Sequence, residues 1–265
     1  MNSRYIGAMI ITPFLIFVFL GGIYLKYAIM ILSLLAMHEF YEVIKQKGIN
    51  TIGIIGYLLC IVYYITLGIN MNPKLIFFFL VITVFFMLCI QVIDTEYNFI
   101  DISTTVFGFL YVAIFFSFIV MVNNKVHGNY LVWLIFISSW SCDTIAYYTG
   151  RAFGKTKLCP KVSPKKTMEG SIGGIIGSAV ACGIFGLFII SKGVIASKYN
   201  FFVVGIICGI FCQFGDLTAS SIKRYVGVKD YSNLIPGHGG ILDRFDSILF
   251  SSVAVYYYIT FIMGI

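Results

Sequence analysis

The stretch from residue 215 to 247 concentrates acidic, basic and hydroxyl side chains between two apolar runs. If its first part is helical, four of these side chains share one face: Asp216, Ser220, Lys223 and Arg224. A carboxylate, a hydroxyl and two cations on one face can hold a metal ion together with the phosphate oxygens that the ion bridges. The stretch therefore predicts phosphate and metal chemistry rather than packing alone.

The second part of this stretch is predicted to be a loop that leads into the last helix. Proline and glycine surround His238, and Gly239 and Gly240 follow it, which excludes a regular helix there. Asp243 and Asp246 come next, at the expected helix start, where carboxylates are favoured by the helix dipole and can share a divalent cation. For any one of these residues, a solvated loop with capping aspartates is the competing interpretation.

These residues carry a family resemblance. The run is Ser220-x-Ile222-Lys223-Arg224, then Lys229-Asp230, then His238-Gly239-Gly240-x-x-Asp243-Arg244-x-Asp246. With this spacing it resembles the signature of the phosphatidate cytidylyltransferases, also called CDP-diacylglycerol synthases.

A second motif lies upstream, in the basic loop of residues 151–170. Its residues are Ser163-Pro164-Lys165-Lys166-Thr167-x-Glu169, and they resemble the same family. A serine cap followed by proline predicts a helix that starts at Ser163, with Lys165 and Lys166 near its positive end and suited to phosphate. The alternative is a plain basic loop against anionic lipid, which explains neither the Ser-Pro start nor Glu169.

Asp143 interrupts an otherwise apolar stretch, about two turns inside the expected membrane edge. A carboxylate in hydrocarbon costs several kcal/mol unless it is paired or faces a wet cavity. We therefore interpret Asp143 as a substrate-binding residue, against the alternative of a structural hydrogen bond to a neighbouring helix.

The composition indicates an all-α polytopic membrane protein. The chain has 265 residues, of which 60% are hydrophobic and 11% are charged, whereas soluble domains carry about 25% charged residues. Nine spans are expected, over residues 6–24, 27–44, 52–70, 74–93, 102–122, 130–150, 171–191, 199–221 and 246–264. Residues 1–125 are predicted to be a transmembrane scaffold and 126–265 the catalytic region, within one integral membrane unit.

The distribution of charge predicts the topology. With the loop 151–170 placed inside, only Lys26, Lys74, Lys125, Lys192 and Lys198 among the basic residues fall outside. This places the N-terminus and the active site on the cytoplasmic side, in a bacterial-type plasma membrane. The net charge of +7 is therefore attributed to topology, and no nucleic-acid partner is expected. The seven cysteines form no CxxC pair and are interpreted as buried apolar residues.

Two further patterns are interpreted as structural. Small residues four apart, such as Gly170 with Gly174 and Gly205 with Gly209, predict close helix packing inside one bundle rather than a dimer seam. Homodimers do occur in the family that the chain resembles, so a homodimer stays open. The sequence His38-Glu39-x-x-Glu42 lacks the second histidine of a zinc-protease motif, so we expect a helix end at the headgroups or a contribution to the rim of the site.

The resemblance implies CMP transfer from CTP to phosphatidic acid within membrane lipid. The implied catalytic residues are Asp216, Asp243, Asp246, Lys223 and Lys229, and the three aspartates would hold Mg²⁺, with a second cation left open. The implied substrate-binding residues are Asp143, Ser163, Lys165, Lys166, Thr167, Glu169, Ser220, Arg224, Asp230, His238, Gly239, Gly240 and Arg244. Two alternatives stay open: a CTP-dependent enzyme acting on a prenyl or archaeal lipid, and a membrane transporter.

Overall fold

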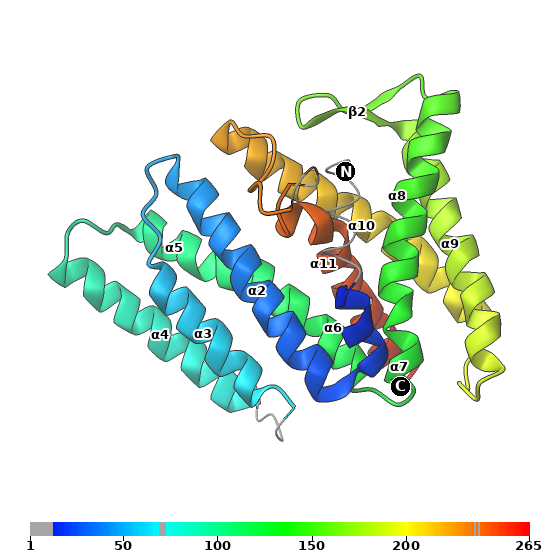
Figure 1. Ribbon diagram of the computed structural model, residues 1–265, viewed down its shortest axis with the longest axis horizontal. Coiled ribbons are helices and arrows are strands. Elements are labelled where there is room, and N and C mark those ends of the chain that lie inside the picture. The colour runs from blue at the N-terminus through cyan, green and yellow to red at the C-terminus, as the bar shows by residue number, and fades with distance from the viewer. Residues whose placement is uncertain (1–12, 69–72, 236, 238) are drawn as a thin grey trace. The chain divides into compact units, whose positions relative to one another are not determined.

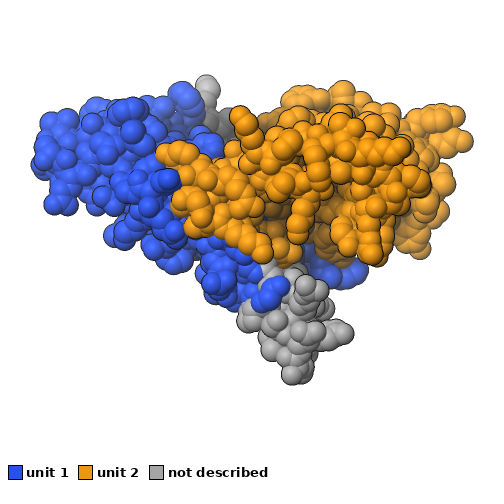
Figure 2. Space-filling view, turned by 90° about the horizontal axis from the view of Figure 1, so that it is seen from above, with its two compact units in different colours: residues 1–117, 230–242 blue, residues 118–229, 243–265 orange. Residues whose placement is uncertain are grey.

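In its described residues the protein is predominantly helical, as expected (Figure 1). The computed structural model describes residues 13–68, 73–235, 237 and 239–265. It divides into two compact units, which Figure 2 distinguishes by colour. The first unit comprises residues 1–117 and 230–242, and the second comprises residues 118–229 and 243–265.

The first unit is built from helices that pack through buried aromatic side chains. Its elements are α2 (Gly22–Lys45), α3 (Gly53–Thr66), α4 (Pro73–Ile93), α5 (Phe99–Gly108), the π-helical η1 (Phe109–Ile114) and the start of α6 (Phe115–Asn123). The Tyr41 hydroxyl donates to the Thr105 carbonyl at 2.8 Å, and the Tyr64 hydroxyl donates to the Ala113 carbonyl at 3.0 Å. These bonds satisfy the polar ends of side chains whose rings fill the core between α2, α3 and the α5–η1 helix.

The second unit contains four long helices and one hairpin. Its elements are α7 (Gly128–Leu131), α8 (Trp133–Phe153), β1 (Lys157–Cys159), β2 (Ser163–Thr167), α9 (Met168–Ile190), α10 (Lys198–Val226), α11 (Leu242–Tyr257) and the π-helical η2 (Tyr258–Ile262). The two strands are antiparallel, with Lys157 opposite Thr167 and Cys159 opposite Ser163. The hairpin connects α8 to α9, and these two helices run side by side (Figure 1).

Glycines set the spacing of α8, α9 and α10. A Cβ atom at Gly174 would lie 3.0 Å from the Cys142 carbonyl of α8, and one at Gly170 would lie 2.8 Å from the Ala146 carbonyl. On α10, a Cβ atom at Gly205 would lie 2.6 Å from the Ser178 carbonyl of α9. The predicted close packing within one bundle is therefore confirmed.

Five helices among the described residues are long and apolar enough to cross a membrane. They span Gly22–Lys45, Phe99–Asn123, Met168–Ile190, Lys198–Val226 and Leu242–Ile262, and each overlaps an expected span. With the apolar composition, they make the chain an integral membrane protein. Several boundaries differ from expectation: α10 runs on to Val226 and α11 starts at Leu242. The helix that ends the first expected span stops before Gly21, and α2 starts at Gly22, because both glycines have positive φ.

Candidate active site

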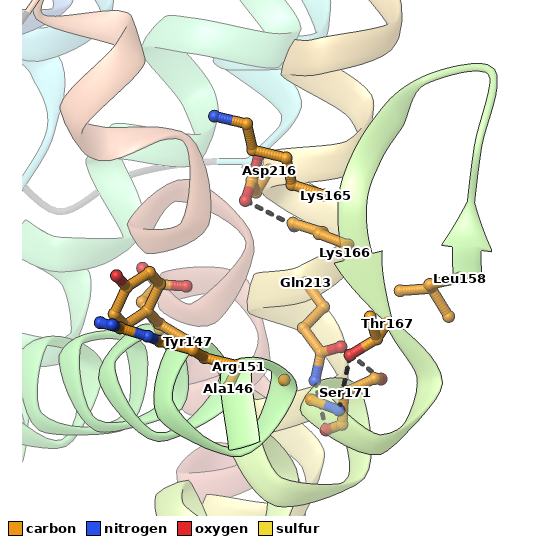
Figure 3. A pocket seen from close by; sticks show the side chains of 13 residues that line it. Ala146, Tyr147, Arg151, Leu158, Lys165, Lys166, Thr167, Ser171, Gln213 and Asp216 are labelled. Carbon is orange, nitrogen blue, oxygen red and sulfur yellow. Dashed lines mark hydrogen bonds and ion pairs between the residues drawn. The ribbon is translucent and has the colours of Figure 1, made fainter. Parts of the chain in front are cut away.

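A cavity of about 360 Å³ in the second unit gathers five of the predicted site residues (Figure 3). Its walls come from α8, the hairpin, the start of α9 and the middle of α10. The residues that line it are Asp143, Ala146, Tyr147, Gly150, Arg151, Leu158, Lys165, Lys166, Thr167, Gly170, Ser171, Gln213 and Asp216. The structure thus brings Asp143, Lys165, Lys166 and Asp216 to one cavity from segments far apart in the sequence.

An ion pair between β2 and α10 lies at this cavity. The Lys166 Nζ atom is 2.5 Å from Asp216 Oδ2, and the two side chains are 26% and 30% exposed (Figure 3). Ser220, one turn further along α10, donates its hydroxyl to Asp216 Oδ1 at 3.2 Å. The shared helical face expected for Asp216 and Ser220 is therefore present, and both oxygens of this carboxylate have a partner.

A second ion pair joins α10 to α11 in the interior. Lys223 Nζ donates to Asp243 Oδ1 at 2.6 Å, and the side chains are only 11% and 2% exposed. Two predicted site residues are thus each other's partner. Because both charges are largely removed from water, the loss of either one removes a close counter-ion from a position where water cannot fully replace it.

Acidic side chains crowd around Asp216. The carboxylates of Asp143 and Asp246 both repel that of Asp216, whereas Lys166 attracts Asp143 and Lys223 attracts Asp246. The main chains of α10 and α11 are also in direct contact here, because a Cβ atom at Gly215 would collide with the Asp246 carbonyl of α11. Carboxylate oxygens are the type of ligand that a divalent cation prefers, and a bound cation would offset the repulsion between these carboxylates. In the described part of the chain, no group of three or more His, Cys, Asp or Glu is placed to hold a metal ion, so the three-aspartate metal site stays a prediction.

The helix predicted to start at Ser163 does not start there. Ser163 to Thr167 form β2, and α9 begins at Met168 with Thr167 as its cap, the threonine hydroxyl accepting from Gly170 N at 3.1 Å. Pairing of this segment with β1 competes with helix formation, and threonine caps helices nearly as well as serine. Lys165 and Lys166 therefore project from a strand. Glu169 accepts from Thr156 N at 3.2 Å, which ties the start of α9 to the residue before β1, at the base of the hairpin.

The remaining predicted residues lie apart from the cavity lining. Arg224 donates from Nε to the Val162 carbonyl at 3.4 Å, so it contacts the hairpin. Lys229 and Arg244 are exposed. In the first unit, Asp230 is exposed and Gly240 is buried, with Gly239 between these extremes. His238 lies outside the described residues.

Sequence reasoning missed Gln213, which lies one turn before Asp216. Its side chain receives a 2.5 Å hydrogen bond from the Ser171 hydroxyl and donates to the Ser171 and Gly209 carbonyls at 3.1 and 2.9 Å. This network joins α9 to α10 at the cavity wall (Figure 3). An amide directly after a long apolar run was a usable signal, and so was its spacing from Asp216.

Comparison with known proteins supplies an independent line of argument. The sequence model of the "Cytidylyltransferase family" matches residues 2–262. A protein named phosphatidate cytidylyltransferase from Bacillus subtilis is 30% identical over 95% of this chain and 94% of its own length. Proteins of the same name from Staphylococcus haemolyticus and Thermotoga maritima are 34% and 30% identical, over 94% and 98% of this chain and 93% and 96% of their own lengths.

Proposed function

Because the chain belongs to the cytidylyltransferase family, we propose that it transfers CMP from CTP to phosphatidic acid, giving CDP-diacylglycerol and pyrophosphate. Its curated relatives bear the name phosphatidate cytidylyltransferase and align along nearly their whole length. The observation that carries the proposal is the cavity at which Lys166 pairs with Asp216, beside the predicted phosphate-binding Lys165.

The chemistry is a direct displacement at phosphorus. A phosphate oxygen of phosphatidic acid attacks the α-phosphorus of CTP, a new P–O bond forms, and the bond to the β-phosphate breaks with release of pyrophosphate. Both reactants are anions, so the main tasks of the protein are to neutralise charge and to align the attacking and leaving oxygens. No covalent enzyme intermediate is needed.

The basic residues are suited to the phosphates. Lys165 and Lys166 project from β2 at the cavity and would bind the triphosphate or the lipid phosphate. Lys223 sits one turn beyond Ser220 on α10, where it would hold a phosphate oxygen when it is not paired with Asp243. Arg224, Lys229 and Arg244 complete the set of cations. Asp143 lines the cavity, where it would accept from a donor group of the substrate.

The acidic residues are suited to Mg²⁺. Asp216, Asp243 and Asp246 offer the hard oxygen ligands that this ion prefers. When bound, the ion would neutralise charge on the phosphates and orient them. In the structure Lys166 and Lys223 compensate two of these carboxylates, so the same aspartates can be balanced by ammonium groups in the absence of an ion.

We place the active site at the cytoplasmic edge of a bacterial-type plasma membrane, in a protein with nine crossings and a cytoplasmic N-terminus. The concentration of Lys and Arg in the loop 151–170 and around 223–244 supports this orientation. There a lipid can enter from the bilayer while CTP arrives from the cytosol. A prenyl or archaeal lipid as acceptor is not favoured, because the curated relatives are named for phosphatidate.

A product assay tests the function directly. Purified protein with labelled CTP, Mg²⁺ and phosphatidic acid in detergent micelles is expected to yield labelled CDP-diacylglycerol and an equal amount of pyrophosphate. Lys166→Ala is expected to reduce the rate strongly. Absence of the lipid product in the parent protein, with CTP intact, would refute the proposal.

A further inference from the structure

The Glu39 carboxylate on α2 accepts hydrogen bonds from a distant segment of the first unit. This side chain is buried, with 4% of the residue exposed, in a helix apolar enough to cross a membrane. Three donors from the segment 230–242 reach it. The Ser232 hydroxyl donates to Oε1 at 2.6 Å, Ile241 N donates to Oε1 at 2.9 Å and Leu242 N donates to Oε2 at 2.9 Å.

The segment 230–242, which donates to Glu39, carries part of the signature motif. Ile235 N donates to the Gly239 carbonyl at 2.9 Å, so the segment folds back on itself around Gly237, whose φ is 75°. After this turn the chain passes Gly240 and reaches the two backbone N–H groups that Glu39 accepts. One carboxylate therefore fixes both arms of the loop, through Ser232 on one side and Ile241 on the other.

Gly240 is explained by the same carboxylate. A Cβ atom there would lie 2.5 Å from Glu39 Oε2 and 2.8 Å from both Cδ and Oε1, and these are the three nearest atoms. Its φ is not in the left-handed region, so an alanine would not strain the backbone, but its methyl group would push the Glu39 carboxylate from its place. Glycine at 240 and glutamate at 39 thus form a matched pair.

We propose that Glu39 is a positioning residue that holds the signature loop 230–242 in its working conformation. A buried carboxylate is costly unless donors surround it, and those three donors come from this loop. The charge also makes these hydrogen bonds stronger than neutral ones. The loop ends one residue before Asp243 in the sequence, so a fixed backbone at Leu242 limits where the chain can place that residue. The effect on turnover rests on the proposed function, whereas the effect on the loop does not.

Amide hydrogen exchange in detergent tests the loop directly. In Glu39→Gln, the side-chain NH₂ group replaces one carboxylate oxygen. It then faces the N–H of either Ile241 or Leu242 and cannot accept a hydrogen bond from it. We expect exchange at Ile241 and Leu242 to accelerate by about tenfold or more, with helices α3 and α5 unchanged. Glu42→Gln, an exposed glutamate on the same helix, is the matched control and is expected to leave both exchange and turnover at parent values. Unchanged exchange in Glu39→Gln, or a uniform rise across the first unit, would overturn the proposal.

A double-substitution cycle separates positioning from general damage. Gly240→Ala in the parent protein is expected to accelerate exchange of the loop and to lower kcat, because its methyl group displaces the Glu39 carboxylate. In a Glu39→Ala background, the same substitution is expected to add little, since the space is then free. Effects that simply add would overturn the pairing. If the parent forms no CDP-diacylglycerol, the proposed function fails, while the exchange measurements still decide the role of Glu39.

Discussion

Replacement of Asp243 by asparagine is expected to damage stability as well as activity. The Asp243 side chain is 2% exposed, and its partner Lys223 is 11% exposed at 2.6 Å. Asparagine keeps the shape and one carbonyl acceptor but removes the negative charge. The Lys223 ammonium then loses its counter-ion at 2.6 Å in a poorly solvated position, and the more weakly placed attraction of Asp246 replaces only part of that interaction.

The expected magnitude follows from this burial. Removal of one partner from a buried ion pair costs about 3–5 kcal/mol. For a chain of this size, that loss corresponds to a fall in melting temperature of roughly 10 °C. Asp216→Asn is the matched comparison, because its ion pair with Lys166 is about one quarter to one third exposed. Solvent screening reduces the expected cost there to below about 1 kcal/mol.

The assay combines thermal melting in detergent with CDP-diacylglycerol formation. Asp243→Asn is expected to melt well below the parent, and Asp216→Asn close to it, while both lose nearly all turnover because each loses a proposed metal ligand. A double variant with Lys223→Met and Asp243→Leu is expected to regain the melting temperature without regaining activity. Parent-like melting of Asp243→Asn, or retained turnover in both single variants, would refute the reasoning.

Three further predictions can be checked with the same preparation. Turnover is expected to vanish in EDTA and to return with Mg²⁺; full activity in metal-free buffer would contradict the aspartate assignment. Cysteines placed at Lys157 and Lys229 are expected to react with impermeant reagents only from the cytoplasmic side of oriented vesicles, and labelling only from the opposite side would reverse the topology. Gly174→Val is expected to lower the melting temperature markedly, because the added side chain meets the Cys142 carbonyl; a parent-like melting curve would show that α8 and α9 can separate there.

The sequence predicted the helical class, several spans and the helical face shared by Asp216 and Ser220, because these depend on composition and local periodicity. The start of α9 could not be predicted in the same way. Ser163 and Thr167 are both good capping residues, and the choice between them depends on strand pairing with Lys157–Cys159. Local patterns contain no information about that pairing.

Contacts between residues far apart in the sequence could not be predicted either. The motif named Lys223 and Asp243 as site residues but did not indicate that they neutralise each other. The sequence places Glu39 at a helix end or at the rim of the site, but it does not indicate the donors of this side chain, because they lie some 200 residues further along the chain. Gln213 differs from these cases, because its polarity and its spacing from Asp216 are both visible in the sequence.

The contact at Gly215 has a consequence for how the enzyme tolerates different membranes. At this position α10 meets the main chain of Asp246 on α11 without an intervening side chain. Asp216 is the next residue on α10. The distance between its backbone and that of Asp246 is therefore set by a direct main-chain contact. Side chains between helices can change rotamer when the helices shift, whereas a direct contact between two main chains has little room to adjust. The relative placement of these two acids is accordingly expected to be the same in thin and thick bilayers, even where the surrounding helices change their tilt.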